Sequence, residues 1–146
     1  MRVALASDHA GFELKQLLVD HVKAAGFDVL DLGTTDTASV DWPDYGAAIG
    51  HAVAAGEADR GIAVCGSGIG ICIAANKVDG IRAATVHDVT SARMSRQHND
   101  ANVMCLGERF IGIQVAIDAV NAFLSTDFEG GRHQRRVDKV TALEAR

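Results

Sequence analysis

Proline, long apolar runs and paired cysteines are scarce in this chain of 146 residues, and each scarcity excludes a class of protein. The chain contains a single proline, and 48% of its residues are hydrophobic. This composition argues against a low-complexity chain and predicts an ordered, compact one. No apolar run approaches the ~20 residues that span a bilayer, and the amino terminus has the pattern of a strand rather than of a signal peptide. The three cysteines, Cys65, Cys72 and Cys105, are odd in number and lack the paired spacing of a disulfide framework or a zinc site. We therefore expect a cytoplasmic protein with free thiols and no bound metal.

Positive charge is also in deficit, because 14 Lys and Arg residues face 19 Asp and Glu residues, for a net charge of −5. This balance argues against nucleic acid or an anionic membrane as a partner. A small anion would have to be bound by a local basic cluster, and one follows Gly130 and Gly131. Arg132 and Arg136 are four residues apart on a predicted helix, so they share a face and form a fork suited to a phosphate. A solvated basic face is the alternative interpretation.

Five apolar segments alternate with helical segments along the whole chain. The alternation requires parallel strands joined by right-handed crossovers, so it predicts a doubly wound, Rossmann-like α/β sheet of five strands with helices on both faces, in one domain of residues 1–146. The last helix has few apolar residues, which favours packing against a partner subunit. The predicted strands are 2–7, 27–33, 62–64, 81–86 and 102–107, and the predicted helices are 12–25, 45–55, 71–77, 91–97, 111–124 and 132–145.

The segment Cys65-Gly66-Ser67-Gly68-Ile69-Gly70 joins the third strand to a helix. A strand, a glycine turn and a helix start together point backbone N–H groups at a small anion. Cys65 ends the strand and would lie in the same positive field, which favours the reactive thiolate. The turn lacks the Lys-Ser/Thr ending of a nucleotide-binding P-loop and is one residue short of the dinucleotide fingerprint, although Asp88 lies near the distance of a ribose-binding acid. The alternative is a tight turn that needs glycine for packing alone.

Other polar residues follow the strands, at the edge where ligands bind on such sheets. Asp8 and His9 follow the first strand and Arg109 follows the fifth, although a lone Asp-His pair is also common on surfaces and at helix caps. The segment His98-Asn99-Asp100 follows a helix, which in a simple topology places it at the opposite edge of the sheet. It would contribute to a site at the strand ends only if a partner subunit presented it there.

Several blocks of the chain, in their order, resemble a known family, the ribose-5-phosphate isomerase B type, which is grouped with the galactose-6-phosphate isomerase subunits. The resemblance covers almost the whole chain, and it implies a homodimer or a tetramer in which each active site is shared between two subunits. It also implies interconversion of ribose 5-phosphate and ribulose 5-phosphate in the pentose phosphate pathway, with no metal or cofactor. The matching blocks are Ser7–Phe12, Cys65–Gly70, Ala74–Lys77, Ser95–Asp100 with Asn102, and Glu129–Arg136.

The resemblance also implies roles for individual residues. Cys65 matches the general base of the cysteine-bearing branch; a second branch uses a glutamate a few residues later, but residues 71–74 contain no acid here. His98 matches the residue that opens the sugar ring, with Asp8 as a second proton carrier, and Ser67 keeps a hydroxyl where threonine is common. The implied substrate contacts are Asp8, His9, Gly66, Ser67, Gly68, Ile69, Gly70, Asn99, Arg109, Arg132 and Arg136, several of them from the partner chain.

Three other functions stay open on the sequence alone. The first is an isomerase of a six-carbon sugar phosphate, such as allose or galactose 6-phosphate, because only the length of the pocket would differ. The second is a phosphosugar-binding module without catalysis, and the third is a dinucleotide-binding protein.

Overall fold

A sheet of five parallel strands forms the centre of the computed structural model, which describes residues 1–144. The strands lie in the order β2-β1-β3-β5-β4, and every neighbouring pair is parallel. This confirms the five-stranded α/β fold that the alternation of segments predicts. In chain order the elements are β1 (Arg2–Ser7), the 3-10 helix η1 (His9–Gly11), α1 (Phe12–Ala24), β2 (Asp28–Asp31), α2 (Trp42–Ala54), β3 (Arg60–Cys65), α3 (Ile69–Ala75), β4 (Ala83–Thr85), α4 (Val89–Asn99), β5 (Val103–Gly107), α5 (Ile113–Ser125) and α6 (Arg132–Thr141).

The carboxyl ends of the three central strands meet at one edge of the sheet. Ser7 at the end of β1 is opposite Val64, and Cys65 at the end of β3 is opposite Gly107. From β1 the chain first adds β2 on one side of β1. It then adds β3 on the other side, followed by β4 and β5 beyond β3, so the strand order reverses between β1 and β3. Ligands on open α/β sheets bind beside such a reversal. A ligand site is therefore expected at the segments that follow β1, β3 and β5.

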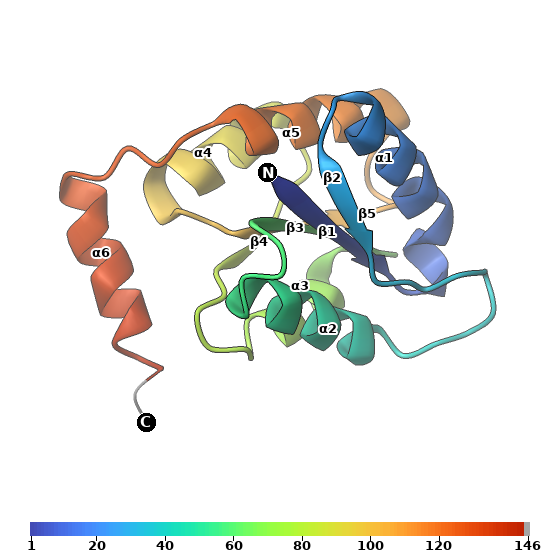
Figure 1. Cartoon of the computed structure of the whole chain (residues 1–146), viewed down its shortest axis with the longest axis horizontal. Coiled ribbons are helices and arrows are strands. Elements are labelled where there is room, and N and C mark those ends of the chain that lie inside the picture. Colours follow the sequence, from blue (N-terminus) through green and yellow to red (C-terminus); the bar gives the residue numbers. More distant parts are fainter. Residues whose placement is uncertain (145–146) are drawn as a thin grey trace.

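Helices cover both faces of the sheet (Figure 1). The helices α1, α4 and α5 pack on a core of large side chains that includes Leu5, Met104 and Phe123. The helices α2 and α3 pack on the other face, where the core is made largely of alanine, cysteine and isoleucine. Small residues allow α2 and α3 to approach closely, since a Cβ on Gly46 would lie 2.6 Å from the Cβ of Ala74. This close packing fixes the helix that follows the glycine turn.

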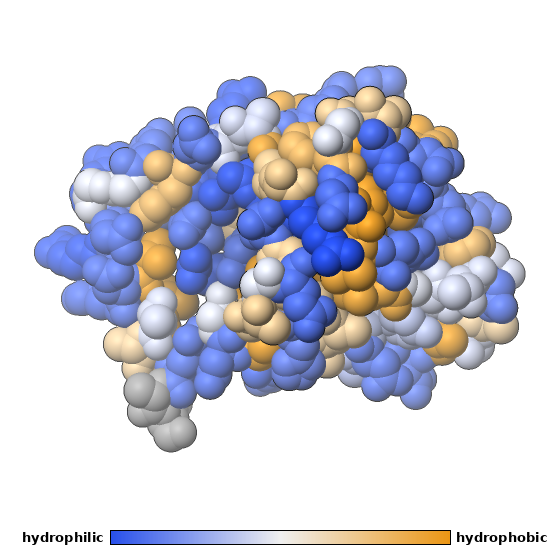
Figure 2. Space-filling view, viewed as in Figure 1, coloured by the Kyte–Doolittle hydropathy of each residue, from blue (hydrophilic) through white to orange (hydrophobic). Residues whose placement is uncertain are grey.

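The helix α6 stands away from the sheet, beyond the amino ends of the strands (Figure 1). A hollow separates it from the rest of the molecule in the space-filling view, and apolar atoms line its inner side (Figure 2). Val137 is buried, whereas Val140 and Leu143 are 50% and 59% exposed. A helix that leaves apolar residues in solvent is consistent with a further packing partner. The prediction that this helix packs on a second subunit stays a prediction.

Some element ends differ from those predicted. The edge strands β2 and β4 are shorter than predicted because each pairs with one neighbour only. The helix α4 extends to Asn99, so the segment predicted as a turn at His98 forms its last helical turn, which ends because Asp100 is left-handed. The last helix ends at Thr141 rather than at Ala145, which lies outside the described residues. Within residues 1–144, no helix is both long and apolar enough to cross a membrane.

Candidate active site

The glycine turn surrounds the sulfur of Cys65, which is 4% exposed at the end of β3. The N–H of Gly68 donates a hydrogen bond to Cys65 Sγ at 3.1 Å. The N–H of Ile69 donates to Ser67 Oγ at 3.2 Å. These two amides, which the sequence assigns to a substrate anion, are therefore already engaged within the turn. The sulfur itself therefore accepts a hydrogen bond from the main chain.

Asp8 and His9 follow β1 and are held by backbone groups. Asp8 Oδ1 accepts hydrogen bonds from the N–H groups of Ala10 (2.9 Å) and Gly11 (3.1 Å), so it caps the 3-10 helix with one oxygen. The N–H of Val40 donates to His9 Nδ1 at 3.1 Å. His9 Nδ1 also lies 3.2 Å from the carbonyl oxygen of Val40, so the Val40 backbone can pair with this nitrogen in either tautomer and leaves Nε2 for another partner. Asp8 retains one carboxylate oxygen and His9 the ring nitrogen Nε2, with which a ligand could be bound.

A cavity of about 250 Å³ opens beside Cys65. The Trp42 indole forms one wall and contacts the turn, since a Cβ on Gly70 would lie 2.9 Å from the ring. The Arg109 guanidinium lies against the turn as well, because a Cβ on Gly66 would be 3.3 Å from it. The cavity is thus lined by a sulfur, a carboxylate, an imidazole and a guanidinium group. Its lining consists of Asp8, His9, Ala10, Trp42, Cys65, Gly66, Ser67, Gly70 and Arg109.

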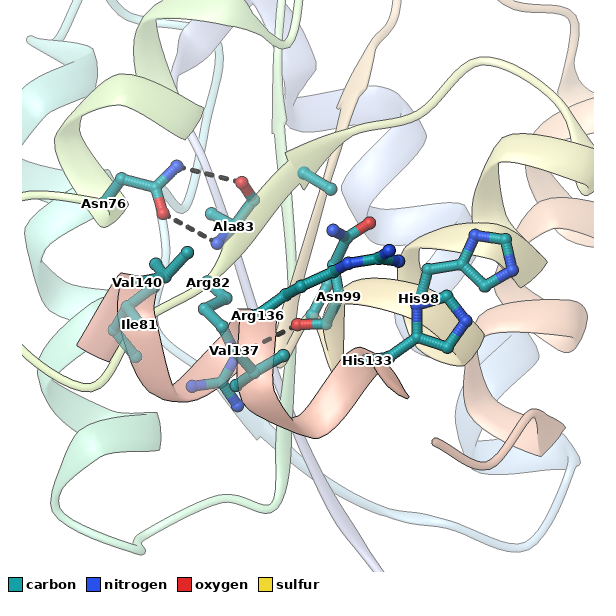
Figure 3. A pocket seen from close by; sticks show the side chains of 12 residues that line it. Asn76, Ile81, Arg82, Ala83, His98, Asn99, His133, Arg136, Val137 and Val140 are labelled. Carbon is teal, nitrogen blue, oxygen red and sulfur yellow. Dashed lines mark hydrogen bonds between the residues drawn. The ribbon is translucent and has the colours of Figure 1, made fainter. Parts of the chain in front are cut away.

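A second cavity, of about 530 Å³, lies at the opposite edge of the sheet, between α6 and the body of the protein (Figure 3). It begins at the segments that precede β4 and β5, and α6 closes its far side. Four of its residues carry cationic or titratable groups that an anion could contact, namely Arg82, His98, His133 and Arg136. The remaining residues are Asn76, Ile81, Ala83, Ala84, Asn99, Ala101, Val137 and Val140.

His98 and His133 stack face to face in this second cavity, with ring centroids 4.4 Å apart and planes 8° from parallel (Figure 3). Burial lowers the pKa of His133, and the positive charges of His98, Arg132 and Arg136 lower it further, whereas Glu129 acts in the opposite direction. Glu129 Oε2 lies 3.6 Å from His133 Nε2. A group of cations that depress the pKa of one of their own neighbours is a good environment for a phosphate.

The same residues bear on whether a metal could bind there. His98, Glu129 and His133 each offer a ligand atom, and these atoms lie within 4.8 Å of one another. However, the lone pairs of an imidazole lie in the plane of its ring, so two parallel stacked rings direct them side by side rather than at one point. Arg132 Nε also lies 3.4 Å from His133 Nε2, which places a positive charge against the group. The arrangement therefore favours an anion over a cation.

The sequence-predicted site residues thus divide between two places in one chain. Asp8, His9, Ser67, Arg109 and Cys65 meet in the first cavity, whereas the predicted contacts of α4 and α6 line or border the second. Several residues that line the cavities were not among the predicted contacts, and Trp42, Arg82 and His133 are those with aromatic or charged groups. Trp42 is the single tryptophan and begins α2, and His133 lies between Arg132 and Arg136, whose spacing predicts a phosphate fork without it.

The remaining thiols, Cys72 and Cys105, lie behind the turn and are not among the residues that line either cavity. A hydrogen bond with Cys105 lowers the pKa of Cys72 to about 6, against the opposing effect of burial. The same hydrogen bond and complete burial raise the pKa of Cys105. Their position identifies Cys65 as the thiol that a ligand could reach.

Residues 3–140 match the protein family described as Ribose/Galactose Isomerase. The chain belongs to that family. It is 47% identical over 145 residues to the ribose-5-phosphate isomerase B of Escherichia coli, covering 99% of this chain and 97% of the relative. It is 43% identical over 145 residues to a putative sugar phosphate isomerase of Bacillus subtilis, with the same coverage.

Solved structures from the Ribose/Galactose Isomerase family superpose closely on this chain. The Clostridium thermocellum ribose-5-phosphate isomerase B matches with a TM-score of 0.98 and 50% identity, covering 99% of this chain and 98% of that one. The Mycoplasma genitalium ribose-5-phosphate isomerase B, with bound ribulose-5-phosphate, matches with a TM-score of 0.94 and 43% identity, covering 99% and 96%. The predicted family resemblance is confirmed.

Proposed function

We propose that this protein is an aldose–ketose isomerase that interconverts D-ribose 5-phosphate and D-ribulose 5-phosphate in the cytoplasm. The observation that carries the proposal is the sulfur of Cys65, which accepts a main-chain N–H at the mouth of a cavity that also holds Asp8 and Arg109. A base beside preorganised donors is what an enediolate intermediate requires. The relatives named for this activity support the same assignment.

The reaction moves a carbonyl group between C1 and C2 of the sugar. In the proposed mechanism, the Cys65 thiolate removes the proton from C2 of the open-chain aldose and returns it to C1, while the hydroxyl proton on O2 passes to O1. Free N–H groups of the glycine turn and the Ser67 hydroxyl stabilise the enediolate oxygen. His98, with Asp8, moves the protons that open the furanose ring before this step. The reaction is an isomerisation within one substrate, and these steps use side chains together with main-chain N–H groups of the turn.

Cys65 and His98 lie in different cavities of one chain, at opposite edges of the sheet. We therefore propose a homodimer in which α4 and α6 of one subunit complete the Cys65 cavity of the other. The exposed apolar face of α3 supports this arrangement, since Ile69 and Ile73 are 52% and 53% exposed beside the glycine turn. The cations of the second cavity would then bind the phosphate, whose binding energy orients the reacting carbons.

Mixing two inactive variants tests the shared site. Cys65→Ala and His98→Asn are each expected to be nearly inactive, but dimers that exchange subunits at random should recover about one quarter of the wild-type sites, because each mixed dimer has one site with both native residues. The measurement is the rate of ribulose 5-phosphate formation after joint refolding. Equal amounts of the two variants refolded separately are the control. No recovery in the joint sample would place both residues in one chain's site.

Arg136→Ala is expected to raise KM for ribose 5-phosphate about 10- to 100-fold with a smaller effect on kcat, because a charge-assisted bond to the phosphate is lost. Arg135→Ala is the matched control, since Arg135 is exposed on the same helix and is not among the residues lining the cavity. The measurement is KM and kcat of both variants by steady-state kinetics, and KM of Arg135→Ala is expected to stay close to that of the wild type. An unchanged KM in Arg136→Ala would contradict the phosphate role.

The preferred sugar is tested by comparing ribose 5-phosphate, allose 6-phosphate and galactose 6-phosphate in one assay. The proposal expects the highest kcat/KM with ribose 5-phosphate. A higher value with either six-carbon substrate would replace the pentose assignment while keeping the chemistry. Binding of all three without turnover would indicate a phosphosugar-binding module.

A further inference from the structure

The residue that ends α4, Asp100, has a left-handed backbone, with φ 46° and ψ 43°. Among residues 1–144 it is the one non-glycine residue with a positive φ. Glycine adopts this conformation without strain, and an aspartate there costs about 1 kcal/mol. A side chain in a strained position is informative where it makes contacts that glycine could not make.

The carboxylate of Asp100 bridges two arginines. Oδ2 accepts from Arg82 Nη2 at 2.9 Å, and Oδ1 accepts from Arg96 Nη1 at 2.9 Å. The side chain of Arg96 is 8% exposed and that of Arg82 is 20% exposed, so the ion pairs are partly shielded from water. Such pairs are stronger than exposed ones, provided that the remaining donors are also bonded.

The two arginines use their remaining donors to tie the end of α4 to three other segments. Arg82, just before β4, also donates from Nε to the carbonyl oxygen of Asn99 at 3.1 Å (Figure 3). The same Nε donates to the carbonyl oxygen of Asp100 at 3.0 Å. Arg96 donates to the carbonyl oxygen of Ala101 (2.6 Å), before β5, and to that of Thr126 (3.3 Å), after α5. These bonds fix the helical turn that carries His98 and Asn99.

The same turn also anchors the segment that leads to α6. The N–H of Glu129 donates to the carbonyl oxygen of Gln97 at 3.1 Å. The position of His98 relative to His133 therefore depends on a turn that the Arg82–Asp100–Arg96 bridge holds. Asp100 is not among the residues that line the cavity, so any effect on the reaction would act through its neighbours.

We propose that Asp100 is a positioning residue for ring opening, holding His98 and Asn99 in register with the substrate through the Arg82–Asp100–Arg96 bridge. This inference rests on the proposed function and adds a residue to it. A displacement of about 1 Å at a reacting group costs on the order of 100-fold in rate, so loss of the bridge should be visible in kinetics. Because the bridge holds the turn that carries the ring-opening group His98, and the Cys65 turn of the proposed shared site belongs to the other subunit, the proton shuttle between C1 and C2 should be affected much less.

The experiment separates ring opening from proton transfer. Ribose 5-phosphate is a cyclic furanose in solution, whereas ribulose 5-phosphate is open-chain because its O5 carries the phosphate. Exchange of the C1 hydrogen of ribulose 5-phosphate with deuterated solvent therefore requires the Cys65 step but not ring opening. The variant Asp100→Asn removes the charge and tolerates the left-handed backbone, and Asp100→Gly removes the whole side chain.

We expect ribose 5-phosphate isomerisation to fall about 10-fold in Asp100→Asn and about 100-fold in Asp100→Gly, with C1 exchange within about threefold of wild type. The matched control is Asp88→Ala, at the other end of α4, where Asp88 Oδ1 accepts from the N–H of Ser91 at 2.7 Å. This control lowers the melting temperature by loss of a helix cap and should leave the ratio of the two rates unchanged.

The outcomes are distinct. A fall in both rates by the same factor in the Asp100 variants, or no fall in either, would overturn the positioning role. If the wild-type protein neither isomerises ribose 5-phosphate nor exchanges the C1 hydrogen, the proposed function fails instead. The expected higher rate of isomerisation in Asp100→Asn than in Asp100→Gly would show that the shape of the side chain contributes to its role.

Discussion

Cys65→Ala is expected to lower kcat for ribose 5-phosphate about 1,000-fold or more, with substrate affinity within a few-fold of wild type. In the proposed mechanism the sulfur of Cys65 carries the proton between neighbouring carbons, and it accepts the Gly68 N–H beside the first cavity. General acid–base groups contribute about 100- to 10,000-fold to rate. Initial rates give kcat, and the shift in melting temperature with added sugar phosphate gives affinity.

The control for this variant is Cys72→Ala. It removes another thiol, which lies in α3 and is not among the residues that line the cavity. Although the pKa of Cys72 is about 6, this thiol is bonded to Cys105 behind the turn. Its replacement is expected to leave kcat within about fivefold of wild type, since the small cavity it creates costs stability rather than chemistry. Near-normal turnover in Cys65→Ala, or an equal loss in the two variants, would reject Cys65 as the base.

Gly68→Ala is expected to have the second largest effect, on folding and turnover together. Gly68 has φ +74°, and a Cβ there would lie 2.8 Å from the backbone carbon of Leu106 and 2.9 Å from the nitrogen of Gly107. The left-handed conformation costs alanine about 1–2 kcal/mol, and the backbone contact adds about 1–3 kcal/mol. Urea denaturation should show this loss, and kcat should fall about 100-fold because the turn moves relative to Cys65.

Gly80→Ala separates the two causes, because Gly80 also has a positive φ, of +84°, but a Cβ there meets nothing within 4 Å. It is expected to cost about 1 kcal/mol of stability without loss of turnover. Equal destabilisation in the two variants would mean that the contact between the turn and β5 is not tight.

The fold could be predicted well from the sequence because each strand is a short apolar run that ends in a turn signal. The glycine turn and Asp8 could be placed at one edge because parallel strands end together. The residue at which α4 ends could not be predicted. It depends on Asp100 adopting a left-handed backbone, and two arginines support that conformation. Nor could the stacking of His98 on His133 be predicted, because it requires knowing where α6 lies after the break at Gly130 and Gly131.

The cations of the second cavity belong to a protein whose net charge is −5. A sugar phosphate dianion approaching from bulk solution would therefore meet a repulsive field at long range and an attractive one only close to the cations that line the cavities. At physiological ionic strength the Debye length is about 8 Å, so salt screens the outer repulsion more completely than the partly enclosed attraction. In the proposed function, capture of substrate is thus a short-range event, in which the second cavity acts only once diffusion has brought the phosphate to its mouth.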